Sequence, residues 1–208
     1  MKNTLLVLLT LIAGNAFGQS ETPLEKEIKF YGEGIVYLES GDELTGKIKH
    51  SRTEDQHIWL YTEGVKKPVK YKIKDVKEFS IGEDYFFVKV KSNTTTKFAQ
   101  YLVNKDNQIK LYDATYQSSI VRGGDIKSGL LHPTFYEYWV FFPGRKSAVS
   151  IKEISLSKKK VAAYVEDCSE LSEKIANKEK GYKISAIIPL PIRLETYKRI
   201  SEEFEDCN

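Results

Sequence analysis

The sequence predicts a mainly β protein, an antiparallel β-sandwich or open barrel of about eight to ten strands followed by C-terminal helices packed on it, α+β overall. Two observations support this prediction. Short stretches of alternating apolar and polar residues, separated by turn residues, recur at fairly even spacing up to about residue 154. Beyond that point apolar residues recur every three or four positions, which is the helical period.

The first hairpin lies near the start of the predicted sheet. Val36 and Leu38 fall on one face of an extended strand. Leu44 and Ile48 fall on one face of its partner. Between them, the Ser-Gly-Asp sequence at 40–42 supplies the positive φ and the side-chain bonds of a tight reversal. An isolated hairpin is marginal in water, so we expect this one to belong to a larger sheet.

The remaining strands follow in chain order. We expect them at 56–62, 69–73, 78–81, 85–91, 97–103, 108–112, 134–142 and 148–154. The last two should pair as a hairpin, and the glycine-containing stretch 118–131 should form a long loop. Strands do not alternate with helices in this part of the chain, so the pattern does not indicate a parallel sheet.

Two helical stripes follow the strands. The first comprises Val161, Val165, Cys168, Leu171 and Ile175, and the second comprises Tyr197, Ile200 and Phe204. We expect both stripes to pack on the sheet or on each other.

The expected organisation has four parts. They are a signal peptide at 1–18, a leader at 19–29, an antiparallel β domain at 30–155 and a helical extension at 156–208. Lys2, the apolar core Leu5–Ala13 and the small residues before Gln19 are typical of a cleaved export signal. The apolar core is too short for a membrane span, so we expect a periplasmic or secreted protein without a transmembrane segment after cleavage.

The net charge and the two cysteines lead to two further expectations, one about nucleic-acid binding and one about a disulfide. A net charge of +3 with both signs interspersed does not predict nucleic-acid binding. The two cysteines, Cys168 and Cys207, are candidates for a disulfide in an oxidising compartment. Two separate buried thiols are the alternative.

The sequence contains no familiar catalytic motif, such as Gly-x-Ser-x-Gly or His-Glu-x-x-His. His50 and His57 are close in sequence, but we expect them to be exposed turn residues, and no metal or cofactor is predicted. Asp84, Asp113 and Glu137 are scattered carboxylates that only the fold can bring together. A hydrolase that uses such carboxylates, with the 118–131 loop as a lid, is therefore one hypothesis.

Two aromatic-rich strands suggest a binding surface. The outward-facing members are expected to be Trp59, Tyr61, Trp139 and Phe141. On a shared face they would stack on sugar rings or anchor a protein partner. Alternatively, helices at 158–180 and 192–205 cover that face as a second core layer, and this interpretation is favoured because the helices need an apolar surface.

Several motifs together resemble a known family. They are Gly-x-x-x-Leu-x-x-Gly-Asp-x-Leu-x-Gly-x-Ile at 34–48, Val-x-Tyr-x-Ile-x-Asp-Val-x-x-Phe at 69–79, Ile-x-Leu-Tyr at 109–112, Tyr-x-Tyr at 136–138 and Glu-Asp-Cys-Ser-Glu-Leu at 166–171. As a set they resemble a family of exported proteins of unknown function from Bacteroidetes-type bacteria. The resemblance implies a secreted or periplasmic β domain with a helical end, and it brings no established catalytic residues.

The function favoured by these observations is that of an exported, non-catalytic binding or scaffold protein of the cell envelope. Its expected partner is an envelope protein or a glycan. A carbohydrate-binding module that uses the exposed aromatics is the first alternative, and the carboxylate-based hydrolase is the second.

Overall fold

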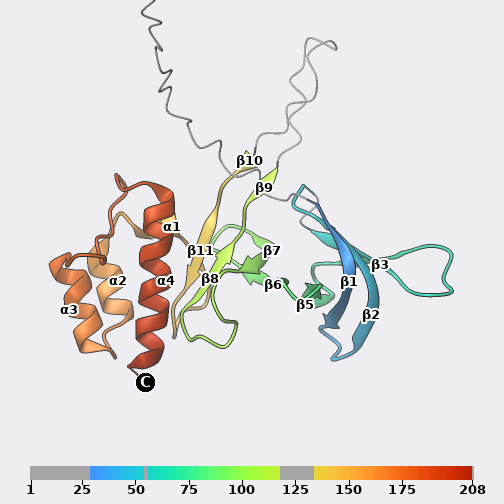
Figure 1. The fold of residues 1–208 in the computed structure, drawn as a ribbon, viewed down its shortest axis with the longest axis horizontal. Helices are drawn as coiled ribbons and strands as arrows, with labels where there is room; N and C mark the ends of the chain where they lie inside the picture. The colour runs from blue at the N-terminus through green and yellow to red at the C-terminus, as the bar shows by residue number, and fades with distance from the viewer. Residues whose placement is uncertain (1–28, 54–55, 118–133, 208) are drawn as a thin grey trace, which may run out of the picture.

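The computed structural model describes residues 29–53, 56–117 and 134–207, which form an antiparallel sheet with helices gathered at one end (Figure 1). The strands of the sheet are β1 (Lys29–Leu38), β2 (Glu43–Ser51), β3 (His57–Tyr61), β4 (Val69–Lys72), β5 (Val76–Ile81), β6 (Tyr85–Lys91), β7 (Thr96–Tyr101), β8 (Lys110–Asp113), β11 (Tyr138–Phe141) and β12 (Val149–Ser150). A separate two-stranded ribbon pairs β9 (Tyr116–Gln117) with β10 (Thr134–Phe135). The helices are α1 (Ile151–Ile154), α2 (Lys158–Tyr164), α3 (Ser169–Asn177) and α4 (Leu190–Asp206).

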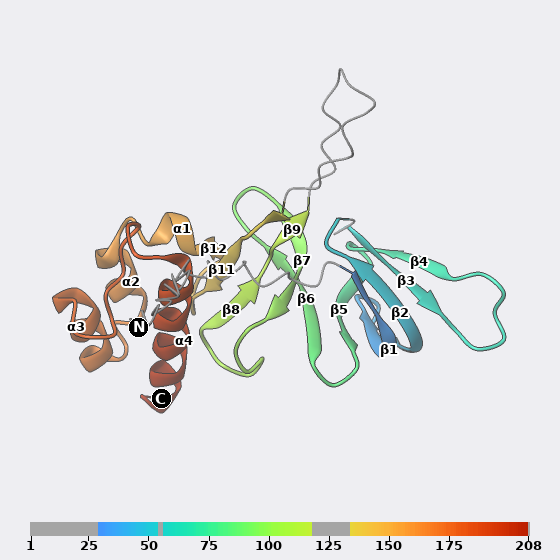
Figure 2. The ribbon, with the colours of Figure 1, turned by 45° about the horizontal axis from the view of Figure 1, so that its top comes forward.

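The ten strands lie in the order β12-β11-β8-β7-β6-β5-β1-β2-β3-β4, and neighbouring strands run antiparallel (Figure 2). The edges, β4 and β12, do not meet, so the sheet is open and not closed. The prediction of a mainly β, antiparallel fold with C-terminal helices is confirmed.

The register of the sheet sorts its side chains onto two faces, because cross-strand partners project to the same side. We call one side the inner face; its partnered residues are Val36, Phe79, Phe87, Gln100, Asp113 and Tyr138. We call the opposite side the outer face; the register places on it Trp59, Lys49 and Tyr31, then Ile35, Ser80 and Phe86, then Val88, Ala99, Tyr101, Tyr112 and Trp139.

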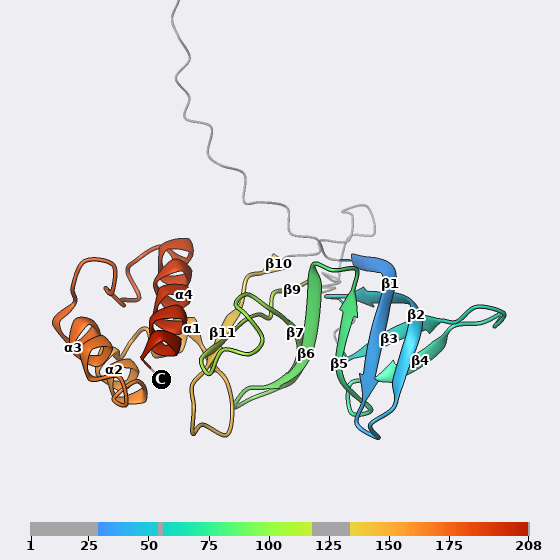
Figure 3. The same ribbon diagram turned by 60° about the horizontal axis from the view of Figure 1, so that its bottom comes forward.

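The inner face carries two apolar cores in succession. Strands β1 to β7 enclose an aromatic-rich core around Phe30, Phe79 and Phe87. Strands β8 and β11 pack Leu111 and Val140 against the helices in a second core. Each fully buried side chain of this size stabilises the fold by about 1.5–3 kcal/mol relative to exposure. The helices therefore cover the inner face at the β8–β11 end (Figure 3).

Both predicted helical stripes point into this second core, since all eight of their residues are buried. Cys168, just before α3, and Cys207, just after α4, are joined by a disulfide with their Cα atoms 5.8 Å apart. The bond ties the end of the last helix to the start of the preceding one.

The predicted strand at 148–154 is wrong after Ser150. Only Val149–Ser150 pairs with β11, and the chain then turns into α1. The Ser150 hydroxyl oxygen accepts a hydrogen bond from the Lys152 backbone N–H at 3.2 Å, which caps the helix. Ile151 and Ile154, three residues apart, both face the second core, so a helical turn buries both of them where a strand would expose one.

Residues 1–28, with the predicted signal peptide and most of the leader, lie outside the described residues. Among the helices of the described ranges, none combines the length and apolar character that crossing a membrane requires.

A buried ion pair joins the two halves of the inner face. Arg52 follows β2 and Asp113 ends β8, and their side chains are 6% and 5% exposed. The guanidinium meets the carboxylate through two contacts, Nη1 to Oδ1 at 3.0 Å and Nη2 to Oδ2 at 3.2 Å. It also donates to the Thr115 carbonyl at 3.1 Å and to Gln100 Oε1 at 3.2 Å. The four acceptor contacts offset the desolvation of the buried charge.

His50 is not the exposed turn residue that was predicted. It lies on β2 in the same alternation as Ile48, so it projects into the aromatic core and is 1% exposed. Four phenylalanine rings surround the imidazole with centroids 5.0–6.0 Å away, those of Phe30, Phe79, Phe87 and Phe98. Burial, with a smaller contribution from the positive charge of Arg52, lowers the pKa of His50 from 6.5 to about 3. The imidazole is therefore neutral in the folded protein at neutral pH.

We expect Arg52→Met and Asp113→Asn each to lower the free energy of unfolding by about 3–5 kcal/mol, because each leaves the other group buried without its partner. The double variant should lose less free energy of unfolding than the sum of the losses in the two single variants. Urea denaturation of the four proteins measures both quantities. Additive losses would show that the two side chains do not stabilise the fold as a pair.

We expect His50 to make the protein less stable as the pH falls below 6.5. The unfolded chain binds a proton at that pH and the native imidazole does not, so unfolding takes up a proton between about pH 6.5 and 3. The free energy of unfolding should fall by up to about 1.4 kcal/mol per pH unit in this window. Urea denaturation at pH 7, 6 and 5 measures the slope, and His50→Phe should flatten it. An unchanged slope in the variant would contradict the assignment.

Candidate functional site

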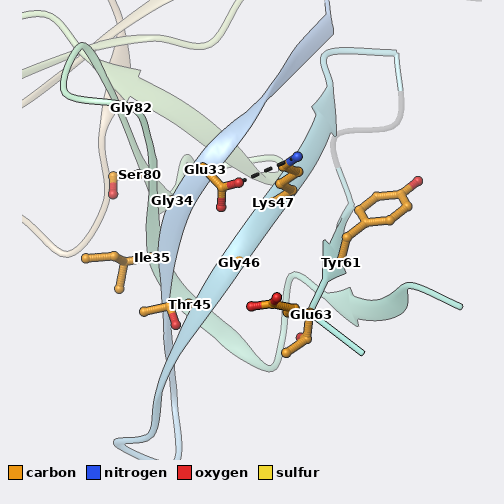
Figure 4. A pocket seen from close by; sticks show the side chains of 11 residues that line it. Glu33, Gly34, Ile35, Thr45, Gly46, Lys47, Tyr61, Glu63, Ser80 and Gly82 are labelled. Atoms are coloured by element: carbon orange, nitrogen blue, oxygen red, sulfur yellow. Dashed lines mark ion pairs between the residues drawn. The ribbon is translucent and has the colours of Figure 1, made fainter. Parts of the chain in front are cut away.

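A hollow of about 810 Å³ opens on the outer face over β5, β1, β2 and β3 (Figure 4). It is lined by Glu33, Gly34, Ile35, Thr45, Gly46, Lys47, Tyr61, Thr62, Glu63, Ser80 and Gly82. We call it the glycine hollow, because Gly34 and Gly46 are direct cross-strand partners among these lining residues. Its size lies within the range of small-ligand sites.

The two glycines are required by the close approach of neighbouring backbones. A Cβ on Gly34 would overlap the Ser80 carbonyl oxygen of β5. A Cβ on Gly46, where φ is +154°, would lie 2.5 Å from the Tyr61 carbonyl oxygen of β3. Glycine in a strand interior commonly marks such a bend or close contact. The backbones of β1 and β5, and those of β2 and β3, therefore approach closely at the glycines that line the hollow.

Polar groups from four strands surround the glycines. Residues Glu33, Lys47 and Tyr61 form one cross-strand row, and Ser80, Ile35 and Thr45 form the next. The Lys47 ammonium lies 3.7 Å from the Glu33 carboxylate, and both side chains are more than half exposed. Such a pair contributes little to stability and is available to a ligand. The hollow thus offers carboxylate, ammonium and hydroxyl groups together.

Exposed aromatic rings flank the hollow. Tyr31 is 62% exposed and Tyr61 is 37% exposed, and their rings meet edge to face with centroids 6.0 Å apart. Trp59, one row away, is half-buried, and the Lys70 ammonium lies 5.3 Å from the centroid of its ring. The structure therefore places Trp59 and Tyr61 on the outer face. Sequence reasoning missed Tyr31, although its alternation with Glu33 and Ile35 was a usable signal.

Trp139 and Phe141 occupy the same outer face, yet they do not join Trp59 and Tyr61 in one patch. Six strands separate β11 from β3, a distance of about 34 Å measured along the sheet. Trp139 is only 1% exposed, packed in a small core with Val90, Ala99, Tyr112, Ala114 and Ala148. Trp139 thus projects to the outer face, but its neighbours cover it and it presents no surface to a ligand.

The covering helices were also placed on the wrong side. They pack on the inner-face residues of β11, namely Tyr138 and Val140. The small side chains of Ala99, Ala114 and Ala148 instead leave the room that the Trp139 indole fills on the outer face.

Two of the three scattered carboxylates are engaged in structural contacts. Asp113 is held by Arg52, and Glu137 lies 3.4 Å from the Lys97 ammonium. Asp84 lies in the turn between β5 and β6, outside this group of contacts. The predicted lid, 118–131, lies outside the described residues. Within the part of the chain that the structure describes, no group of three or more histidine, cysteine or acidic side chains is arranged to hold a metal ion.

Two further hollows open on the outer face beside the first. One, of about 110 Å³, is lined in part by Tyr37, Phe86 and Tyr101, and the other, of about 240 Å³, by Tyr101, Tyr112 and Phe141. Burial, then the nearby charge of Glu78, raises the pKa of Tyr101 to about 12. Its hydroxyl therefore remains a hydrogen-bond donor at neutral pH.

We expect Trp139→Ala to lower the free energy of unfolding by about 3–5 kcal/mol, because it empties a packed site. Tyr61→Ala, at a partly exposed position on the same face, should lower the free energy of unfolding by about 1 kcal/mol or less. Urea denaturation compares the two. A stable Trp139→Ala protein would show that Trp139 is not part of the core.

Comparison of the chain with protein-family models, with curated proteins and with solved structures finds no match. The function is therefore argued from the geometry of the outer face.

Proposed function

We propose that this protein is a non-catalytic binding protein of the cell envelope and that its ligand is a carbohydrate held on the outer face of β1, β2 and β3. The observation that carries the proposal is the pairing of exposed rings with a polar hollow. Tyr31 and Tyr61 present accessible aromatic surface, and the glycine hollow beside them supplies hydroxyl, carboxylate and ammonium groups. Aromatic faces suit the apolar face of a sugar ring, and polar groups suit its hydroxyls.

The sequence and the disulfide support an envelope location. Residues 1–19 have the pattern of a cleaved export signal. The Cys168–Cys207 bond fits an oxidising compartment such as the periplasm or the cell exterior.

A binding role fits the carboxylates of the outer face better than hydrolysis does. The Glu33 carboxylate lies 3.7 Å from the Lys47 ammonium, so it already has a charged partner on the outer face. The buried carboxylate of Asp113 is occupied by Arg52. These contacts favour recognition of a ligand over transfer of a proton to it.

We expect the mature protein to bind glycans on an array of bacterial and plant polysaccharides, and Tyr61→Ala to weaken that binding by about tenfold. Loss of one ring contact accounts for a change of that size. Tyr61→Phe keeps the ring and should bind nearly as well. Phe135→Ala, which removes an exposed ring on β10, is the matched control and should bind as the unmodified protein does.

Three outcomes would contradict the proposal. They are the absence of glycan binding, unchanged binding by Tyr61→Ala, and the appearance of cleaved glycan products on incubation. Cleaved products would instead support the hydrolase hypothesis. With no glycan bound, cross-linking of the protein in intact cells would test for a protein partner.

A further inference from the structure

The segment 184–192, which leads into α4, is apolar and exposed. Its sequence is Ile-Ser-Ala-Ile-Ile-Pro-Leu-Pro-Ile, without a charged residue, in a chain of which 29% is charged. Ile187 is 92% exposed and Ile192 is 58% exposed. The other exposed members are Ala186, Pro189 and Pro191. Single exposed apolar residues are ordinary on a protein surface, whereas a contiguous group of them marks an interaction site. We call 184–192 the apolar tip.

A turn of the backbone directs Ile187 away from the core. The Ile188 backbone N–H donates to the Ser185 carbonyl at 3.2 Å, so Ala186 and Ile187 are the two central residues of the turn. Central turn positions usually carry glycine, proline, asparagine, aspartate or serine. Ile184, just before the turn, is buried in the second core, so the tip is anchored at its base. The fold thus holds an isoleucine at the end of a projecting turn, where almost all of its surface is open to solvent.

A second exposed apolar side chain lies at the same end of the helices. Leu156, in the connection between α1 and α2, is 75% exposed. The preceding residue, Ser155, places this connection beside α4, since its hydroxyl lies 3.5 Å from the Tyr197 hydroxyl. In Figures 1 and 2, α1 lies toward the start of α4, while the C-terminus lies at the other end. Leu156 therefore adds apolar surface to the end of the helices that carries the apolar tip.

The charges of the helices are divided between their two ends. The Cys168–Cys207 disulfide joins the start of α3 to the end of α4, and at this end the ranges 166–170 and 202–206 contain seven acidic residues and no basic one. At the other end, the ranges 151–160 and 178–195 contain eight basic residues and three acidic ones. The start of α2 belongs to this end because the Lys158 ammonium donates to the Ala176 carbonyl, near the end of α3, at 2.8 Å. The exposed apolar surface is thus accompanied by positive charge.

Several of these positive charges are available to a partner. Lys159, Lys160 and Lys183 are exposed. Among the described residues, no carboxylate lies within ion-pair distance of their ammonium groups. Of the acidic residues at this end, Glu195 is already paired with Lys198 at 2.9 Å. Exposed ammonium groups next to apolar side chains suit a surface that is negatively charged outside and apolar within.

A bilayer that contains anionic phospholipids has this arrangement. Apolar side chains of a peripheral protein enter the boundary between headgroups and acyl chains, and lysines beside them contact the lipid phosphates. A stable protein–protein interface buries about 800 Å² on each partner, and a projecting turn offers little area for it. A fluid bilayer, in contrast, surrounds a projecting turn. The shape and the charge of this end therefore favour a lipid surface over a protein.

We propose that the apolar tip inserts into the surface of a bilayer that contains anionic phospholipids, with Lys159, Lys160 and Lys183 against the headgroups. Repulsion then directs the acidic end of α3 and α4 away from the membrane. This membrane attachment does not depend on the proposed carbohydrate binding. The two are compatible, because the helices and the glycine hollow on β1 to β3 lie at opposite ends of the molecule (Figure 1).

The experiment is co-sedimentation of the mature protein with vesicles, either of phosphatidylcholine alone or of phosphatidylcholine and phosphatidylglycerol in equal amounts. The protein should bind the mixed vesicles, and the affinity should fall as salt is raised. Ile187→Ser with Ile192→Ser should weaken that binding by about tenfold or more, because two apolar side chains no longer enter the bilayer. Val65→Ser with Val69→Ser, at exposed apolar positions at the far end of the sheet, is the matched control and should bind as the unmodified protein does.

The charge requirement is tested with a second pair of double variants. Lys159→Gln with Lys160→Gln should lower the affinity for the mixed vesicles by about fivefold or more and reduce its salt dependence. Lys66→Gln with Lys67→Gln makes the same change in net charge in the exposed connection between β3 and β4 and should bind as the unmodified protein does. Equal losses in both would show a general charge effect and overturn the assignment to this end of the helices.

Insertion of the tip is measured with a fluorescent reporter. Ile187→Trp should show an emission shift to shorter wavelength when mixed vesicles are added, because the new indole leaves water for the bilayer interface. Val65→Trp carries an additional indole outside the tip and should show no shift. Trp59 and Trp139 are present in both proteins, so the difference between the two spectra reports on the tip alone.

Three outcomes would overturn the proposal. They are the absence of vesicle binding, equal losses in the two pairs of serine variants, and an unshifted emission of Ile187→Trp. Urea denaturation checks that the serine variants stay folded, as expected for exposed positions. Glycan binding by the Ile187→Ser and Ile192→Ser double variant should be unchanged, so a failure of membrane attachment and a failure of carbohydrate binding are observed separately.

Discussion

The guanidinium of Arg52 and the carboxylate of Asp113 meet where the inner face changes from one core to the other. On one side of them lie the phenylalanines of β1 to β7, and on the other lie the strands that the helices cover. The bidentate contact, with Gln100 and Thr115 as further acceptors, satisfies polar groups that would otherwise be buried without partners. The sheet can therefore continue through this point without a break between its two cores.

The same junction is reinforced just outside the sheet. The Gln117 backbone N–H donates to the Arg52 carbonyl at 3.4 Å, and the Thr53 hydroxyl donates to Gln117 Oε1 at 3.3 Å. The turn after β2 is thus attached to β9, more than sixty positions later in the chain. With both cores on the inner face, much of the opposite face carries no helix, and its hollows remain open to solvent.

The parts of the fold that depend on local pattern could be predicted from the sequence. Alternation located the β1–β2 hairpin, and the spacing of Val161 to Ile175 and of Tyr197 to Phe204 located the helical faces that are buried. The failures concern information that is not local. Asp113 lies 61 residues from Arg52, and no spacing in the sequence links them.

The candidate site shows the same limit. Trp59 and Trp139 do project to one face, but the number of strands between them is a property of the whole sheet order. Alternation on a strand also cannot tell a residue covered by neighbours from one open to solvent, so the sequence left open whether Trp139 is exposed and did not indicate which neighbours bury it. His50 was assigned to a turn because it lies at the start of a polar stretch between two strands, whereas its parity with Ile48 places it in the aromatic core.

The open sheet leaves β4 as a terminal strand, and its composition has a consequence for behaviour at high concentration. A terminal strand can recruit a strand from another molecule and so begin an intermolecular sheet. Here Pro68 precedes the strand, and Lys70 and Lys72 lie within it, features that discourage such pairing because proline lacks a donor and like charges repel. At the opposite edge, β12 is two residues long and leads directly into α1. These features of the two edge strands therefore oppose the growth of the open ten-stranded sheet into fibres.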